Sequence, residues 1–278
     1  MREGELMTNV SVTRAGSRGN DGIGALKAAT TIWFGVMVIS QWLFVYYIAA
    51  FYAEPTLSGQ FAAWNEHPFL SPFVRGDIIG NLAFATHVML AIFITFGGTL
   101  QLIPQLRATA PWLHRWNGRL FILFSLAVTL AGFYMVWLRE PVTDISAELA
   151  ISINGALILL FAALAWREGI KRSIVSHRRW ALRALLAVNG VFFLRLVFSG
   201  WLVLTQREPD VMQFRVFEYA SYLVPLLVLQ LYLYSSERGG TAMRYLAAMA
   251  LYLVSAAMCI GAFGFSMIFV RLIVFGQS

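Results

Sequence analysis

The stretch AATTIWFGVMVISQWLFVYYIAAFYA, residues 28–53, decides the fold, because it contains no charged residue. A helix that crosses a hydrocarbon core of about 30 Å needs roughly 20 apolar residues. Backbone N–H and C=O groups in lipid must form hydrogen bonds within their own segment. A run of this length and composition therefore predicts one membrane-spanning helix.

Further apolar runs of the same kind follow along the chain. They cover residues 78–104, 113–138, 145–166, 180–205, 216–235 and 243–270. The chain is 59% hydrophobic and only 13% charged, whereas soluble proteins carry roughly 25% charged residues. Strands of a membrane barrel would be shorter and would alternate in polarity. The sequence therefore predicts an all-α integral membrane protein with seven transmembrane helices.

Lysine and arginine residues gather on one side of the predicted membrane. Excluding Arg195 inside a run, fifteen lie in the N-terminal stretch and near the connections after the second, fourth and sixth runs, against five on the other side. The fifteen are Arg2, Arg14, Arg18, Lys27, Arg107, Arg115, Arg119, Arg167, Lys171, Arg172, Arg178, Arg179, Arg183, Arg238 and Arg244. Since basic loops stay in the cytoplasm, we expect a cytoplasmic N-terminus and a C-terminus outside.

This charge distribution also predicts the surroundings of the protein. We expect a multi-pass protein of the bacterial cytoplasmic (inner) membrane, with the lipid bilayer and its anionic lipid headgroups as partners. The net charge of +7 is explained by the basic face, so no nucleic-acid partner is expected. We expect residues 1–27 to form a disordered basic cytoplasmic tail and residues 28–278 a single seven-helix transmembrane domain.

Signatures of soluble enzymes are missing from the sequence. It holds no phosphate-binding glycine loop, dinucleotide fingerprint, HExxH motif or nucleophile elbow. Cys259 is the single cysteine, so an intrachain disulfide and a cysteine-cluster metal site are excluded. Chemistry in this chain must therefore depend on histidines and on charged groups within the membrane.

Two histidines open the third and fifth runs in similar motifs, Leu-His-Arg-Trp at His114 and Ser-His-Arg-Arg-Trp at His177. Both runs cross the membrane in the same direction, so the two imidazoles are expected at the same depth. Two facing imidazoles are what ligation of haem b requires, with both histidines as iron ligands. The arginines that could pair with haem propionates are Arg115, Arg119, Arg178 and Arg183. The alternative is that these residues are ordinary anchors at the membrane interface.

His87 is expected near the membrane midplane, because it lies ten residues, about 15 Å of helix, beyond Asp77. Small residues share its helical face, which allows close approach of a neighbouring helix or of a flat cofactor. His87 could thus serve packing, a second haem or a quinone. His67, in the preceding loop, is interpreted as a surface histidine.

Arg195 is a charged residue inside the fifth run. A charge within a span is usually paired or functional. Glu218, near the start of the sixth run, is expected at a compatible depth. We therefore expect an intramembrane ion pair between Arg195 and Glu218.

The order of these residues resembles a known family. The pattern comprises His87, Gly97-Gly98, Gln101, Arg107, Pro-Trp-Leu-His-Arg-Trp-Asn-Gly-Arg at 111–119, His-Arg-Arg-Trp-Ala-Leu-Arg at 177–183, Arg195 and Glu218. It resembles the bacterial predicted membrane proteins grouped as DUF2306, a domain of unknown function. The layout is more loosely similar to transmembrane diheme cytochromes b, which carry electrons on haems held by four histidines of four consecutive helices. Here the fourth run supplies no histidine, which removes one complete haem site.

Three functions remain open at the level of the sequence. The first is a membrane redox protein that binds haem b through His114 and His177 and transfers electrons. The second is a non-catalytic accessory or assembly subunit of a larger membrane complex, which would dock through small-residue faces. The third is a transporter or lipid-handling protein that uses the region of Arg195.

The charge asymmetry predicts the topology. Reporters fused to the N-terminus and inserted in the 167–179 connection should be active in the cytoplasm, and a reporter after Ser278 should be active outside. A C-terminal reporter that is active only in the cytoplasm would contradict the seven-helix count.

Overall fold

The computed structural model describes residues 3–66, 72–139 and 144–275, and the described residues contain helices and no strand. Side chains are described for residues 21–66, 72–139 and 144–270. The longer helices are α1 (Glu3–Ile48), α3 (Ile78–Leu102), α5 (Pro111–Tyr134), α6 (Ile145–Ile170), α7 (Ile174–Val188), α8 (Gly190–Thr205), α9 (Val211–Glu237) and α10 (Thr241–Phe275). The short ones are α2 (Glu54–Leu57), α4 (Pro104–Thr109), the 3₁₀ helix η2 (Phe61–Glu66) and two π-helical turns, η1 (Ala49–Ala53) and η3 (Met135–Arg139).

The helices confirm the all-α membrane fold that the sequence predicts. Among the described residues, 6 helices are long and apolar enough to cross a membrane, and 7 spans result if α7 and α8 form one. These two helices meet at Asn189 with a bend of 49°. The seven apolar runs thus correspond to seven spans, with the fifth one bent.

Helix α1 extends further than expected, since it begins at Glu3. The sequence predicts a disordered tail over residues 1–27, whereas the structure continues the first membrane helix back through this stretch. No proline interrupts residues 3–48, and adding residues to an existing helix costs far less than starting a new one. His67 lies outside the described residues.

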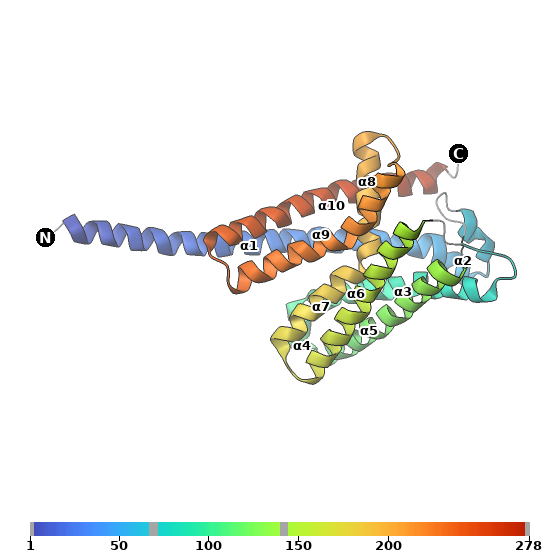
Figure 1. Cartoon of the computed structure of the whole chain (residues 1–278), viewed down its shortest axis with the longest axis horizontal. Coiled ribbons are helices and arrows are strands. Elements are labelled where there is room, and N and C mark those ends of the chain that lie inside the picture. Colours follow the sequence, from blue (N-terminus) through green and yellow to red (C-terminus); the bar gives the residue numbers. More distant parts are fainter. Residues whose placement is uncertain (1–2, 67–71, 140–143, 276–278) are drawn as a thin grey trace.

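The spans form two groups (Figure 1). Helices α3, α5, α6 and α7 pack side by side. Ile94, Phe121, Val128 and Leu185 form a core between α3, α5 and α7, and Ile158 and Phe161 of α6 pack with α7. Helix α10 packs along α1 and against α8, and α9 lies between α10 and α7. The bent span α7–α8 therefore belongs to both groups and connects them.

Glycines allow α8 and α10 to approach closely. A Cβ atom added at Gly261 would lie 2.4 Å from the carbonyl oxygen of Leu196, and one at Gly264 would lie 2.5 Å from that of Ser199. Gly200 of α8 faces Gly261 directly. Such backbone contact provides van der Waals packing, which drives helix association where lipid is as apolar as the helices.

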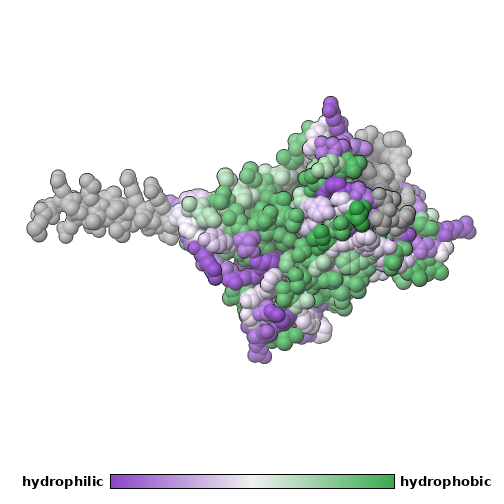
Figure 2. All heavy atoms as spheres, in the orientation of Figure 1, coloured by the Kyte–Doolittle hydropathy of each residue, from purple (hydrophilic) through white to green (hydrophobic). Residues whose placement is uncertain are grey.

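Large apolar side chains cover the flanks of the bundle, and hydrophilic residues gather at its ends (Figure 2). Leu82, Leu138 and Leu227 are 65%, 76% and 68% exposed in the isolated chain. Such exposure would be costly in water, so it indicates contact with the lipid bilayer.

The close contact at Gly261 predicts that Gly261→Ala destabilises the protein, by about 1–3 kcal/mol if the helices must move apart. Thermal unfolding of the purified protein measures this. Gly35→Ala is the matched control, since nothing lies within 4 Å of a Cβ atom at Gly35 and alanine favours a helix by about 1 kcal/mol. Equal melting temperatures for the two variants would contradict this packing.

Candidate functional site

At the ends of the spans that the sequence places outside, two arginines are paired with carboxylates. Arg139 donates through Nε to Asp77 at 2.8 Å and through Nη2 to the Pro72 carbonyl at 2.7 Å. The Asp77 side chain also caps α3 by accepting from the Gly80 N–H at 2.8 Å. This N–H and the Arg139 guanidinium hold the pKa of the Asp77 carboxyl below its usual value.

The second pairing corrects an expectation from the sequence. Glu218 accepts a hydrogen bond from Arg215 at 2.5 Å, and Arg215 also pairs with Asp144 at 2.7 Å. The prediction of an ion pair between Arg195 and Glu218 is therefore wrong. The partner of Glu218 is Arg215, which lies one turn earlier on the same helix. Arg215 also lowers the pKa of the Asp144 carboxyl.

Arg195 instead turns toward the aromatic side chains of α1. Its guanidinium carbon lies 5.6 Å from the ring centre of Phe44 and 6.0 Å from that of Tyr47. Its Nε is buried and has no hydrogen-bond partner, and within the described part of the chain it forms no ion pair. The charge of Arg195 acts on His87 and Tyr52 as well. A cation in the membrane interior thus has rings as neighbours and lacks an anion.

Asn189 occupies the bend between α7 and α8. It donates to the Leu185 carbonyl at 2.8 Å and accepts from Gln41 of α1 at 2.7 Å, and both side chains are buried. The Asn189 N–H still bonds to the Leu185 carbonyl at 3.3 Å, so the side-chain amide adds a second donor to the same carbonyl at the bend. The bend and Gln41 were not identified from the sequence, in which Asn189 is one polar residue within an apolar run.

The ring of His87 bridges two helices. Its Nδ1 lies 3.0 Å from the Val128 carbonyl oxygen of α5. Because a carbonyl oxygen can only accept, Nδ1 carries the proton and Nε2 has a free lone pair. A Cβ atom added at Gly132 would lie 3.6 Å from the His87 ring, an ordinary van der Waals separation, so the ring packs against α5 at this glycine. His87 therefore has the packing role that the sequence allows, with Nε2 still available.

His177 is held in the same way, and His114 lies in its vicinity. The Nδ1 of His177 lies 2.8 Å from the Ala165 carbonyl oxygen of α6, which again leaves Nε2 with the lone pair. His114 and His177 are near enough for their charges to interact. The backbone of His114 is tied to α3, since its carbonyl accepts from Gln101 at 3.0 Å. The structure thus has both histidines at the same end of the four-helix group.

The predicted propionate partners point in different directions. Arg183 bonds to Gln230 of α9 at 2.6 Å and stacks on Trp180, so its guanidinium is directed toward α9. Arg119 lies over Trp116, with its guanidinium 4.9 Å from the ring centre. Arg115 acts electrostatically on His114, and Arg178 is exposed. Of the four, Arg115 is the one whose charge acts on His114.

A conventional metal cluster is not among the described residues, since no group of three or more His, Cys, Asp or Glu side chains there could hold a metal ion. A haem iron needs only two protein ligands, with the porphyrin supplying the others. The two-histidine arrangement is therefore the one to consider in this chain.

A protein-family model described as "Predicted membrane protein (DUF2306)" matches residues 84–233. The matched region contains His87, His114, His177, Arg195 and Glu218 and covers more than half of the chain. No curated protein and no solved structure matches the sequence.

The pairing of Glu218 predicts the result of two double-mutant cycles. Arg215→Gln and Glu218→Gln should show a coupling energy of about 0.5–3 kcal/mol in unfolding measurements, because the two groups are in contact. Arg195→Gln and Glu218→Gln should be additive within roughly 0.5 kcal/mol. Coupling in the second cycle that exceeds coupling in the first would restore the rejected pair.

Proposed function

The chain belongs to the DUF2306 family of predicted membrane proteins, and we propose that this member is a redox protein of the bacterial cytoplasmic membrane that binds haem b. The proposed iron ligands are His114 and His177. When bound, haem iron supplies one-electron transfer by alternating between two oxidation states.

The observation that carries this proposal is the hydrogen bond between His177 and the Ala165 carbonyl. Histidines that ligate metals usually donate their other ring N–H to a carbonyl or carboxylate, which fixes the tautomer and the ring orientation. His177 meets this requirement through the carbonyl of a neighbouring helix, and His114, near enough for the two charges to interact, supplies a second imidazole at the same end. The chemistry of the two side chains fits a bis-imidazole site.

Other side chains of this end suit the same role. Gly118 lies one turn beyond His114, and it faces the side chain of Gln101, which bonds to the His114 carbonyl. Arg115 places a positive charge near His114. A guanidinium in this position can pair with a carboxylate and would hold a propionate at the membrane surface.

The unpartnered Arg195 favours a second candidate, the handling of a lipophilic ligand. Carbonyl or carboxylate oxygens would supply the acceptors that the guanidinium lacks. A quinone is one such ligand, and His87 with its available Nε2 lies within reach of the Arg195 charge. An accessory role in a larger complex stays an alternative, which co-purification of a stoichiometric partner would test.

Thermal unfolding distinguishes a ligand-binding role of Arg195 from a structural one. Because its charge has no anionic partner, Arg195→Met should unfold at the same or a higher temperature than the wild type. Phe44→Leu, which removes the ring and keeps Arg195, is the companion variant. A clear loss of stability in Arg195→Met would assign a structural role to the arginine and weaken the ligand-handling proposal.

Haem binding predicts a coloured protein. The purified wild type should show a Soret band and, on reduction, sharp α-bands. His114→Ala and His177→Ala should each abolish or shift these bands, because each removes an iron ligand.

His67→Ala and His87→Ala are the controls, and both should keep the spectrum of the wild type. Loss of the bands in His87→Ala alone would move the site to the midplane. A wild type purified after haem-supplemented expression with no haem absorption would refute the redox proposal.

A further inference from the structure

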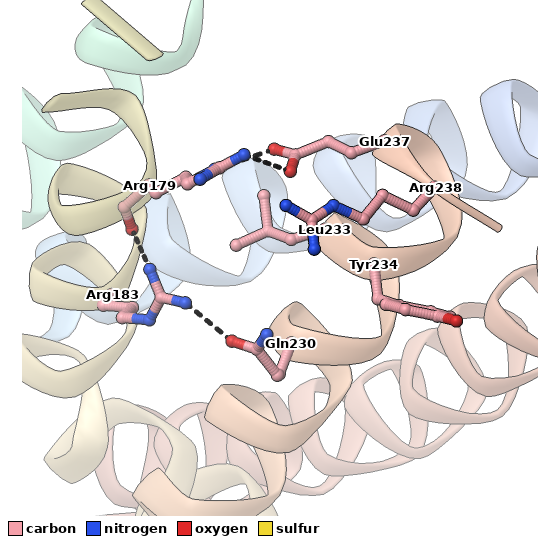
Figure 3. A pocket seen from close by; sticks show the side chains of 7 residues that line it. All are labelled: Arg179, Arg183, Gln230, Leu233, Tyr234, Glu237 and Arg238. Carbon is pink, nitrogen blue, oxygen red and sulfur yellow. Dashed lines mark hydrogen bonds and ion pairs between the residues drawn. The ribbon is translucent and has the colours of Figure 1, made fainter. Parts of the chain in front are cut away.

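A basic pocket lies where the two groups of helices meet, between α7 and α9 (Figure 3). Its volume is about 160 Å³, and its lining residues are Arg179, Arg183, Gln230, Leu233, Tyr234, Glu237 and Arg238. Three guanidinium groups thus face a single carboxylate. This pocket is separate from the proposed haem site, because its lining contains neither His114 nor His177.

Hydrogen bonds fix two of the three guanidinium groups. Arg179 pairs with Glu237 through two hydrogen bonds, which neutralises its charge. Arg183 donates to Gln230 at 2.6 Å and to the Arg179 carbonyl at 3.1 Å, and it stacks on Trp180. Neither acceptor of Arg183 carries a formal charge, and three of its five N–H groups are left over.

Arg238 is the third guanidinium and extends between these two pairs, over Leu233 (Figure 3). In the described part of the chain it forms no ion pair and its side chain makes no hydrogen bond. With three arginines and one glutamate, the pocket therefore keeps an excess of two positive charges, and neither Arg183 nor Arg238 is bonded to a carboxylate. An anion with several acceptor oxygens would satisfy both, as a phosphate group does.

We propose that this pocket binds the phosphate of an anionic phospholipid. Sites that enclose a whole small molecule measure about 300–1,000 Å³, so a pocket of 160 Å³ suits a headgroup whose chains lie outside. Such chains have an apolar path on α9, where Leu223, Leu227 and Tyr234 share one face and are 42%, 68% and 49% exposed. Basic pockets between transmembrane helices bind lipid headgroups in this manner.

Native mass spectrometry of the full-length protein in neutral detergent tests the proposal. Phosphatidylglycerol should stay bound to the wild type, whereas phosphatidylcholine should not. Arg183→Gln and Arg238→Gln should each weaken phosphatidylglycerol binding about fivefold, as expected for the loss of one basic contact. Arg244→Gln, an arginine of the same end outside the pocket, is the matched control and should bind as the wild type does.

Melting temperatures of all variants verify that they are folded, and Arg238→Lys, which keeps the charge, should keep most of the binding. Equal binding of both lipids, or an equal loss in Arg244→Gln, would overturn the proposal in favour of unspecific attraction to the basic face. Inorganic phosphate should not displace the lipid at equal concentration. Displacement would assign the pocket to a free phosphate compound instead.

Discussion

Hydrocarbon offers no hydrogen-bond partner to a polar group, and this constraint determines the structure of the whole chain. The backbone satisfies it by forming long helices, and polar side chains satisfy it by bonding across helices. Gln41 reaches from α1 to Asn189 at the bend of the fifth span, and Asn117 of α5 donates to the Gly97 carbonyl of α3 at 2.8 Å. These contacts select which helices are neighbours, because apolar packing alone distinguishes poorly between partners in lipid.

Charged residues at the outer helix ends follow the same constraint. Arg139 and Arg215 lie at helix ends, and each is bound to a carboxylate. Arg195 lies deeper, beside the rings of Phe44 and Tyr47. Cation–π contact contributes up to about 2 kcal/mol when desolvated, and the buried Nε–H still has no acceptor. An arginine without an anionic partner lowers the stability of the fold within the membrane. Destabilising groups of this kind are typical of functional sites.

The spans could be predicted from the sequence because length and apolarity are local properties. Residues 28–53 and the six other runs correspond to helices in the structure. Partners across helices could not be predicted, since spacing gives the depth of a residue and leaves the direction of its side chain open. Arg195 and Glu218 have compatible depths and still face different neighbours. One signal for Glu218 was present, because Arg215 precedes it by three residues, a spacing that brings side chains together on a helix.

For the histidines, too, the position along the helix was predictable from the sequence, whereas the partners of the side chains were not. Their motifs placed His114 and His177 at the starts of two helices that run in the same direction, and both lie at that end in the structure. The carbonyl of Ala165 that fixes the His177 ring belongs to the preceding helix, and a backbone acceptor leaves no trace in the sequence. The sequence also did not reveal that the Arg183 side chain is directed toward α9, because this direction depends on Gln230 of a later helix.

Electron paramagnetic resonance of the oxidised, purified protein tests the central claim most directly. Ligation by the imidazoles of His114 and His177 predicts a low-spin ferric signal of the bis-histidine type, which either histidine-to-alanine variant converts to a high-spin signal or abolishes. A protein that contains no haem iron, or one whose low-spin signal survives both substitutions, would contradict the account.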